Sequence, residues 1–291
     1  MLHTLRSACL RVTVSEQGAQ LQSILGQDGT EYLWQGDPAY WADRAPNIFP
    51  YVARLTKGSY YLDNRLYHMD THGIARRSRF RVLSDDGSSL VLELTDDADS
   101  YQKYPRHFSF QIIYRLDADT LHITFRVENR DEKTMFFGFG GHPGFRVPLM
   151  PGMRFEDYRL RFHTPCQPQR VGFTNACFLT GQSEPYPLQQ DMYLPLRHDL
   201  FDDDAIVLSG MSRTVTLESV SGGHGVTVFF PDMPYLGIWH KPRTDSPYVC
   251  IEPWSSLPST QDQIAVLEQQ PDLLSLAPGG IMENTWTVQL H

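Results

Sequence analysis

The chain has 291 residues, a formal net charge of −9, 41% hydrophobic residues and 20% charged residues, which is an ordinary composition for a globular protein. The acidic balance argues against a nucleic-acid partner, because binding to phosphates requires a basic surface. The densest basic stretch, Arg76-Arg77-Ser78-Arg79, has a pattern that is more often a solvated turn. No segment reaches the length of about 18 apolar residues that a membrane span needs, so we expect no membrane partner.

The cysteines Cys9, Cys166, Cys177 and Cys250 are scattered along the chain. Their spacing matches neither the CxxC motifs of zinc and redox sites nor a disulfide framework. Residues 1–10 lack the long apolar stretch that is typical of a signal peptide. We therefore expect a protein that is reduced and cytoplasmic.

Alternation of apolar and polar residues, which is typical of half-buried strands, dominates the chain. Residues 58–69 predict a hairpin centred on Asp63-Asn64. Apolar stripes then predict strands at residues 90–94, 108–116, 121–127 and 286–290. Helical periodicity is weak, and its best candidate, residues 261–270, ends at Pro271. Strands separated by turn residues predict an all-β fold, a large antiparallel β-sandwich. No linker divides the chain, so we expect one domain over residues 1–291.

Two segments interrupt this alternation by placing a polar side chain directly before a proline. In Phe139–Phe145, three glycines surround His142 and allow backbone conformations that other residues resist. In Val249–Trp254, Glu252 lies within an apolar strand. A histidine in a glycine-rich loop is more often a satisfied loop residue than a catalytic one. A buried carboxylate is costly unless it is paired, so Glu252 has either a structural partner or a pKa adjusted for catalysis.

Other segments carry polar groups whose role the pattern leaves open. His72, before Gly73, is either a site residue or a surface histidine. Arg54 lies among apolar residues of the sequence. It is either a structural partner for a carboxylate or a hydrogen-bond donor to a substrate. Residues 231–241 are rich in polar groups and in aromatic side chains, which suit a sugar ring and a hydrophobic core equally well.

At six short segments the sequence resembles the aldose 1-epimerase (galactose mutarotase) family, and within it the LacX-like branch. These segments occur in family order and extend from about residue 18 to the end of the chain: residues 31–37, 47–50, 71–76, 141–145, 235–239 and 250–254. The resemblance implies a galactose mutarotase-like β-supersandwich with a site on one concave face. One departure is that Pro143-Gly144-Phe145 follows the histidine, where another branch has a longer Asn-x-x-His context followed by Tyr-Phe-Asn. The substrate preference of that branch therefore does not carry over.

The same resemblance assigns roles to individual residues. It implies that His142 is the general acid and Glu252 the general base. It implies that Arg54, His72 and Asp232 contact the sugar, and the aromatic face of Trp239 completes the expected substrate-binding set. Position 53, an alanine here, is commonly glycine in relatives, which we interpret as a tolerated change in a loop.

The implied reaction fits these residue types. Interconversion of α and β anomers requires ring opening, rotation about C1–C2, and reclosure. A base removes the proton of the C1 hydroxyl while an acid protonates the ring oxygen. Histidine suits the acid because its unperturbed pKa lies near neutrality. The reaction needs no metal, nucleotide or redox cofactor, so we expect none. The expected partner is a small sugar, bound by a monomer or a homodimer.

Three alternatives remain at this stage. A glycoside hydrolase mostly needs two carboxylates, and only Asp202-Asp203-Asp204, which more often starts a strand or turn, offers a second one. A non-catalytic sugar-binding protein on the same fold has no need to keep both His142 and Glu252. A hexose 6-phosphate is a possible substrate, because Arg54, Arg76 and Lys241 are available cations.

Overall fold

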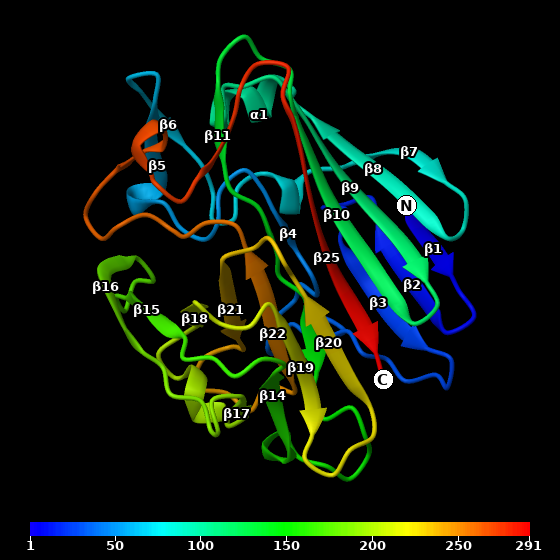
Figure 1. The fold of residues 1–291 in the computed structure, drawn as a ribbon. Helices are drawn as coiled ribbons and strands as arrows, with labels where there is room; N and C mark the ends of the chain where they lie inside the picture. Colours follow the sequence, from blue (N-terminus) through cyan, green and yellow to red (C-terminus); the bar gives the residue numbers. More distant parts are fainter.

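The computed structural model describes residues 1–291, and its regular structure is mainly antiparallel β-sheet (Figure 1). The larger sheet contains, in spatial order, β17 (Tyr193–Pro195), β14 (Tyr158–Phe162), β19 (Thr214–Ser219), β20 (Gly225–Phe229), β25 (Ile281–Leu290), β10 (Thr120–Asn129), β9 (Phe108–Asp117), β8 (Ser89–Thr95) and β7 (Arg81–Asp85). The second sheet contains β16 (Leu179–Pro185), β15 (Gln169–Phe173), β18 (Ile206–Ser209), β21 (Tyr235–Trp239), β22 (Tyr248–Trp254), β12 (Gly140–Gly141) and β4 (Asn47–Ile48), while β13 (Gly144–Arg146) also pairs with β22. The predicted all-β class is confirmed.

Smaller elements surround these two sheets. One small sheet contains β1 (Leu2–Arg6), β2 (Leu10–Ser15) and β3 (Leu21–Gly26); another contains β23 (Ala265–Val266), β5 (Ser59–Leu62) and β6 (Arg65–His68); and β11 (Met135–Phe137) pairs with β24 (Leu274–Leu276). The only α-helix is α1 (Ala98–Lys103), and the short 3₁₀ turns are η1 (Thr56–Gly58), η2 (Ala75–Arg77), η3 (Phe155–Asp157), η4 (His198–Phe201) and η5 (Leu267–Gln269).

The strands predicted from alternation form the centre of the larger sheet. In β10, Leu121, Ile123, Phe125 and Val127 are buried, and the polar residues between them are partly exposed. β10 pairs along its whole length with β9 and with β25, so the inward stripes of all three strands face the same core. That core is a single cluster of 64 buried residues with members from both large sheets. This continuity supports the single domain that we propose.

The predicted hairpin is present, and its turn explains why. β5 and β6 pair directly through Asp63 and Asn64, which adopt φ values of 51° and 59°. Asparagine and aspartate tolerate the left-handed conformation that a two-residue hairpin turn requires.

The helix predicted at residues 261–270 is wrong. This stretch forms β23, which pairs in parallel with β5, and the short turn η5. Pairing with β5 provides hydrogen-bond partners for the extended backbone of β23. The weak helical pattern of the sequence therefore does not determine the structure of this segment. The helix that does form, α1, has a capping box in which Asp97 Oδ1 accepts from Ser100 N and Ser100 Oγ accepts from Asp97 N, both at 2.8 Å. The Asp-x-x-Ser spacing was a usable start signal.

Strand β22 carries Glu252 and is buried along its whole length. Its packing therefore fixes the position of this side chain. Alternate residues of a strand point to opposite faces. Val249 and Ile251 point into the main core, whereas Cys250 and Trp254 belong to separate clusters on the other face. Glu252 shares that other face, where the second sheet carries a cavity.

Candidate active site

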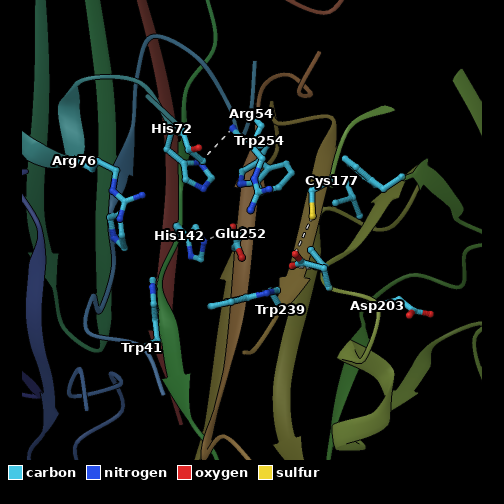
Figure 2. A pocket seen from close by; sticks show the side chains of 17 residues that line it. Trp41, Arg54, His72, Arg76, His142, Cys177, Asp203, Trp239, Glu252 and Trp254 are labelled. Carbon is cyan, nitrogen blue, oxygen red and sulfur yellow. Dashed lines mark hydrogen bonds and ion pairs between the residues drawn. The ribbon is translucent and has the colours of Figure 1, made fainter. Parts of the chain in front are cut away.

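The cavity is open to solvent on one side and encloses about 920 Å³ together with the space in its mouth. Its walls come from segments far apart in the sequence (Figure 2). The lining residues are Trp41, Pro46, Ala53, Arg54, Thr71, His72, Arg76, His142, Phe173, Cys177, Asp203, Asp204, Ala205, Val207, Trp239, Glu252 and Trp254.

His142 and Glu252 lie together at the base of this cavity. His142 Nε2 is 3.2 Å from Glu252 Oε2, and the two side chains are 11% and 1% exposed. The residue before His142 must be small, because a β-carbon on Gly141 would lie 2.5 Å from the ring of Trp286. The backbone N–H of His142 donates to the carbonyl of Pro46 at 3.0 Å, which fixes the residue between β12 and β13.

Burial controls the protonation of this pair. It lowers the pKa of His142 to about 3, and the positive charge of Arg76 acts in the same direction. Burial raises the pKa of Glu252 well above its usual range, and the charge of Asp204 adds to this. Because the two pKa values move in opposite directions, the pair retains one proton in total over a wide pH range.

Several buried polar atoms around the pair have no hydrogen-bond partner within the protein. They include His142 Nδ1 and Trp254 Nε1, and also Glu252 Oε2, whose 3.2 Å approach to His142 Nε2 lacks hydrogen-bond geometry. Buried polar groups are normally satisfied, and all three of these side chains line the cavity. Unsatisfied donors and acceptors that converge on an open cavity are typical of a site for a polar ligand.

His72, to which the family resemblance assigns a contact with the sugar, lines the cavity. It and Ala53 both have left-handed backbones, with φ values of 66° and 55°. The two residues are joined twice, because His72 N donates to Ala53 O at 2.9 Å and Ala53 N donates to His72 Nδ1 at 3.2 Å. Since Nδ1 accepts a hydrogen bond, Nε2 carries the hydrogen, and burial lowers the pKa of His72 well below its usual value. His72 is therefore a neutral donor.

The other predicted contact residues divide into two groups. Arg54 and Trp239 line the cavity, and so does Arg76, whose Nη2 lies 2.5 Å from Asp43 Oδ2. Asp232 does not line it. This exposed residue lies in the turn before β21, so the whole strand separates it from Trp239. Its position does not support the expected contact with a sugar.

Lys241 also lies outside the cavity lining. Its Nζ donates instead to the carbonyl of Ala39 at 3.0 Å. This ammonium group is therefore used to hold a loop.

The sequence interpretation missed Asp204 and Cys177. Asp204 belongs to the acidic run of residues 202–204, which forms the predicted turn before β18. The side chain of Asp204 also lines the cavity. The thiol of Cys177 donates to Asp204 Oδ2 at 2.9 Å. Burial, together with this hydrogen bond, raises the pKa of Cys177 to about 12. Cys177 is thus a fixed donor that orients the Asp204 carboxylate. Neither residue lies in a periodic pattern that could have revealed it.

One cluster has the composition of a metal site. Donor atoms of His142, Cys250 and Glu252 all lie within 4.8 Å of one another. A metal would need the thiolate form of the cysteine. Burial raises the pKa of the Cys250 thiol well above its usual range, so forming the thiolate there is costly. This cost weighs against a metal at the cluster.

Gly73 holds the His72 loop against the core, which gives a first testable prediction. Its φ is +75°, and an added β-carbon would overlap the carbonyl oxygen of Phe49. We expect Gly73→Ala to lower the free energy of unfolding by about 2 kcal/mol or more. Gly87→Ala is the control, because its φ is +83° but no atom lies within 4 Å of the added carbon. Urea denaturation measures both, and equal losses would contradict the close contact at Gly73.

Comparison with known proteins places this site in a family. The model of the family described as aldose 1-epimerase matches residues 1–266, so the chain belongs to the aldose 1-epimerase family. Chromosomal protein LacX of Lactococcus lactis subsp. lactis is 33% identical over 283 residues, covering 94% of each chain.

Solved structures give the same result. A galactose mutarotase related enzyme from Lactobacillus acidophilus superposes with a TM-score of 0.95 at 32% identity, covering 100% of this chain and 97% of that one. A galactose mutarotase-like protein from Lactobacillus casei gives a TM-score of 0.94 at 30% identity, with 100% of both chains covered. None of the helices in the structure has the length and apolar character needed to cross a membrane.

Proposed function

We propose that the protein is an aldose 1-epimerase that interconverts the α and β anomers of an aldohexose, with His142 and Glu252 as its acid–base pair. The observation that carries this proposal is the buried pair itself, 3.2 Å apart at the base of an open cavity. Family membership supports it, because the pair lies in two of the segments that carry the family resemblance.

The reaction starts from the arrangement in which Glu252 is ionised and His142 is protonated. Glu252 takes the proton of the C1 hydroxyl, while His142 gives its proton to the ring oxygen. The bond between C1 and the ring oxygen breaks, and C1 becomes an aldehyde. After rotation about C1–C2, the protons return along the same route and the ring closes with the opposite configuration. The protein regains its starting protonation state.

The cavity walls offer suitable partners for sugar hydroxyls. His72 presents a neutral N–H donor, and the carboxylate of Asp204 presents an acceptor held by Cys177. Trp239 supplies an aromatic ring beside the pair, 5.7 Å from the ring of His142 and nearly perpendicular to it. A ring with hydroxyls on its edge and C–H groups on its faces is complementary to this arrangement.

The charges of the wall favour an uncharged sugar. Asp203 and Asp204 both line the cavity, and the guanidinium of Arg76 is already paired with Asp43. A hexose 6-phosphate remains the second candidate because Arg54, at the mouth, is held only by a 3.3 Å bond to the carbonyl of Ala176. Its guanidinium is therefore available to a phosphate.

The experiment is to follow the optical rotation of freshly dissolved α-glucose and α-galactose, with and without protein, and to repeat it with the 6-phosphates. We expect faster equilibration than in buffer alone, with the free sugars as the better substrates. Faster turnover of the 6-phosphates would correct the substrate class. No acceleration with any of these sugars would refute the proposal and favour a binding protein on the same fold.

Asp204 gives a prediction about substrate binding. We expect Asp204→Asn to raise KM about 10- to 100-fold, because a hydrogen bond to a charged group is replaced by a weaker neutral one. Asp202→Asn is the matched control, since Asp202 is exposed in the same loop and does not line the cavity. Equal effects of the two substitutions on KM would exclude Asp204 from the sugar site.

A further inference from the structure

Trp41 lies against the ring of His142. The two ring centroids are 5.0 Å apart, with an angle of 31° between the planes. Trp41 also contacts Trp239 at 5.5 Å in an edge-on geometry and Tyr248 at 5.7 Å in a stacked one. Figure 2 shows Trp41 below His142, on the side of the imidazole away from His72. The indole therefore forms one wall of the pocket around the imidazole.

The segment that carries Trp41, residues 35–46 between β3 and β4, is fastened at several points. Trp41 N donates to Asp37 O within the segment, and the indole N–H of Trp34, just before it, donates to Trp41 O, both at 2.8 Å. The outer tethers are the ion pair between Arg76 and Asp43, the bond from Tyr40 Oη to Asp245 Oδ1, and the bond from Lys241 Nζ to Ala39 O. The position of the indole is thus fixed before any sugar binds.

The face of an indole attracts a cation within about 6 Å of its centre. A protonated His142 is such a cation, whereas a neutral one is not. The interaction therefore favours one of the two arrangements of the single proton that His142 and Glu252 share. Moving the proton between Glu252 Oε2 and His142 Nε2 leaves the net charge of the pair unchanged.

The other titratable or charged groups that face the pair do not perform this task. They are His72 and Arg76 from the loop before and within η2, Tyr248 and Cys250 from β22, and Asp204 from the loop before β18. His72 is neutral, and Arg76 disfavours a proton on His142. Asp204 favours a proton on Glu252. These groups, together with burial, oppose the reactive arrangement, and the indole face of Trp41 acts against them.

We propose that Trp41 is a positioning residue that increases the share of the reactive arrangement, in which the shared proton lies on His142 and Glu252 is ionised. This inference rests on the proposed function of the pair. It assigns Trp41 an effect on the resting protein, which is measurable without substrate.

The test compares Trp41→Leu, which removes the aromatic face, with Trp41→Phe, which keeps part of it. Nitrogen NMR of protein labelled in histidine distinguishes protonated from neutral His142 in the resting state. In Trp41→Leu we expect the ratio of protonated to neutral His142 to fall about five- to tenfold, and kcat to fall with it. Trp41→Phe is expected to lie between this variant and the wild type.

Tyr40→Phe is the control for the loop. It removes the 3.1 Å hydrogen bond from Tyr40 Oη to Asp245 but leaves the indole of Trp41, which faces His142, unchanged. The His142 signals are therefore expected to stay as in the wild type. Unchanged His142 signals in folded Trp41→Leu would overturn the proposal, even if kcat fell, because the role of Trp41 would then be packing alone. A shift in those signals without mutarotation by the wild type would instead refute the proposed function and leave the proton placement standing.

Discussion

Replacing Glu252 with glutamine is expected to lower kcat about 10²- to 10⁴-fold while the protein stays folded. Glutamine has the shape of glutamate and still accepts a hydrogen bond, but it does not take the proton of the C1 hydroxyl. The loss should appear in kcat with little change in KM, since proton transfer occurs in the reaction step. Polarimetry with α-galactose measures both parameters. A folded Glu252→Gln variant with full activity would refute the role of this residue as the base.

The same substitution should stabilise the protein above acidic pH. The folded-state pKa of Glu252 is raised by burial above its usual value of 4.5. The stabilisation that this shift provides is therefore present below pH 4.5 and is lost as the pH rises through the folded pKa. Glutamine does not titrate, so the free energy of unfolding of Glu252→Gln should exceed that of the wild type increasingly from pH 5 to pH 8. Urea denaturation at several pH values tests this, and a variant less stable at pH 8 would contradict the burial effect.

Replacing His142 with alanine is the second change for which we expect a loss of about 10²- to 10⁴-fold in kcat. Without the imidazole, the ring oxygen has no positioned acid, and Glu252 retains the shared proton. Added imidazole should restore part of the activity, because it can enter the space that the side chain leaves. His122→Ala is the control, since His122 lies on the outer face of β10, away from the cavity. Full activity of a folded His142→Ala variant would exclude it as the acid.

Sequence patterns predicted elements better than their arrangement. Alternation located β8, β9, β10 and β25, and the Asp63-Asn64 turn located the hairpin, because these signals are local. The partners are not local: β10 pairs with β25, whose residues lie more than 150 positions further along the chain. A short extended segment such as β23 owes its structure to pairing with β5, which explains why a weak helical pattern at residues 261–270 was misleading.

The same distinction applies to the site. His142 and Glu252 were identified because glycine and proline interrupt the strand pattern around them, and because the family resemblance gave them roles. Trp41 and Asp204 lie in loops with no periodicity, and long-range strand pairing alone brings them to the cavity. Asp232 was predicted from the resemblance alone, and no local pattern showed that it lies at the far end of β21.

The most direct test of the central claim is the rate of exchange between the two anomers of galactose at equilibrium, measured by proton NMR. The wild-type protein is compared with Glu252→Gln at the same concentration. This variant is the negative control, because its side chain has nearly the same shape but does not act as a base. Our account predicts exchange well above the buffer rate with the wild type and close to the buffer rate with the variant. Equal exchange in the presence of both proteins would contradict the account.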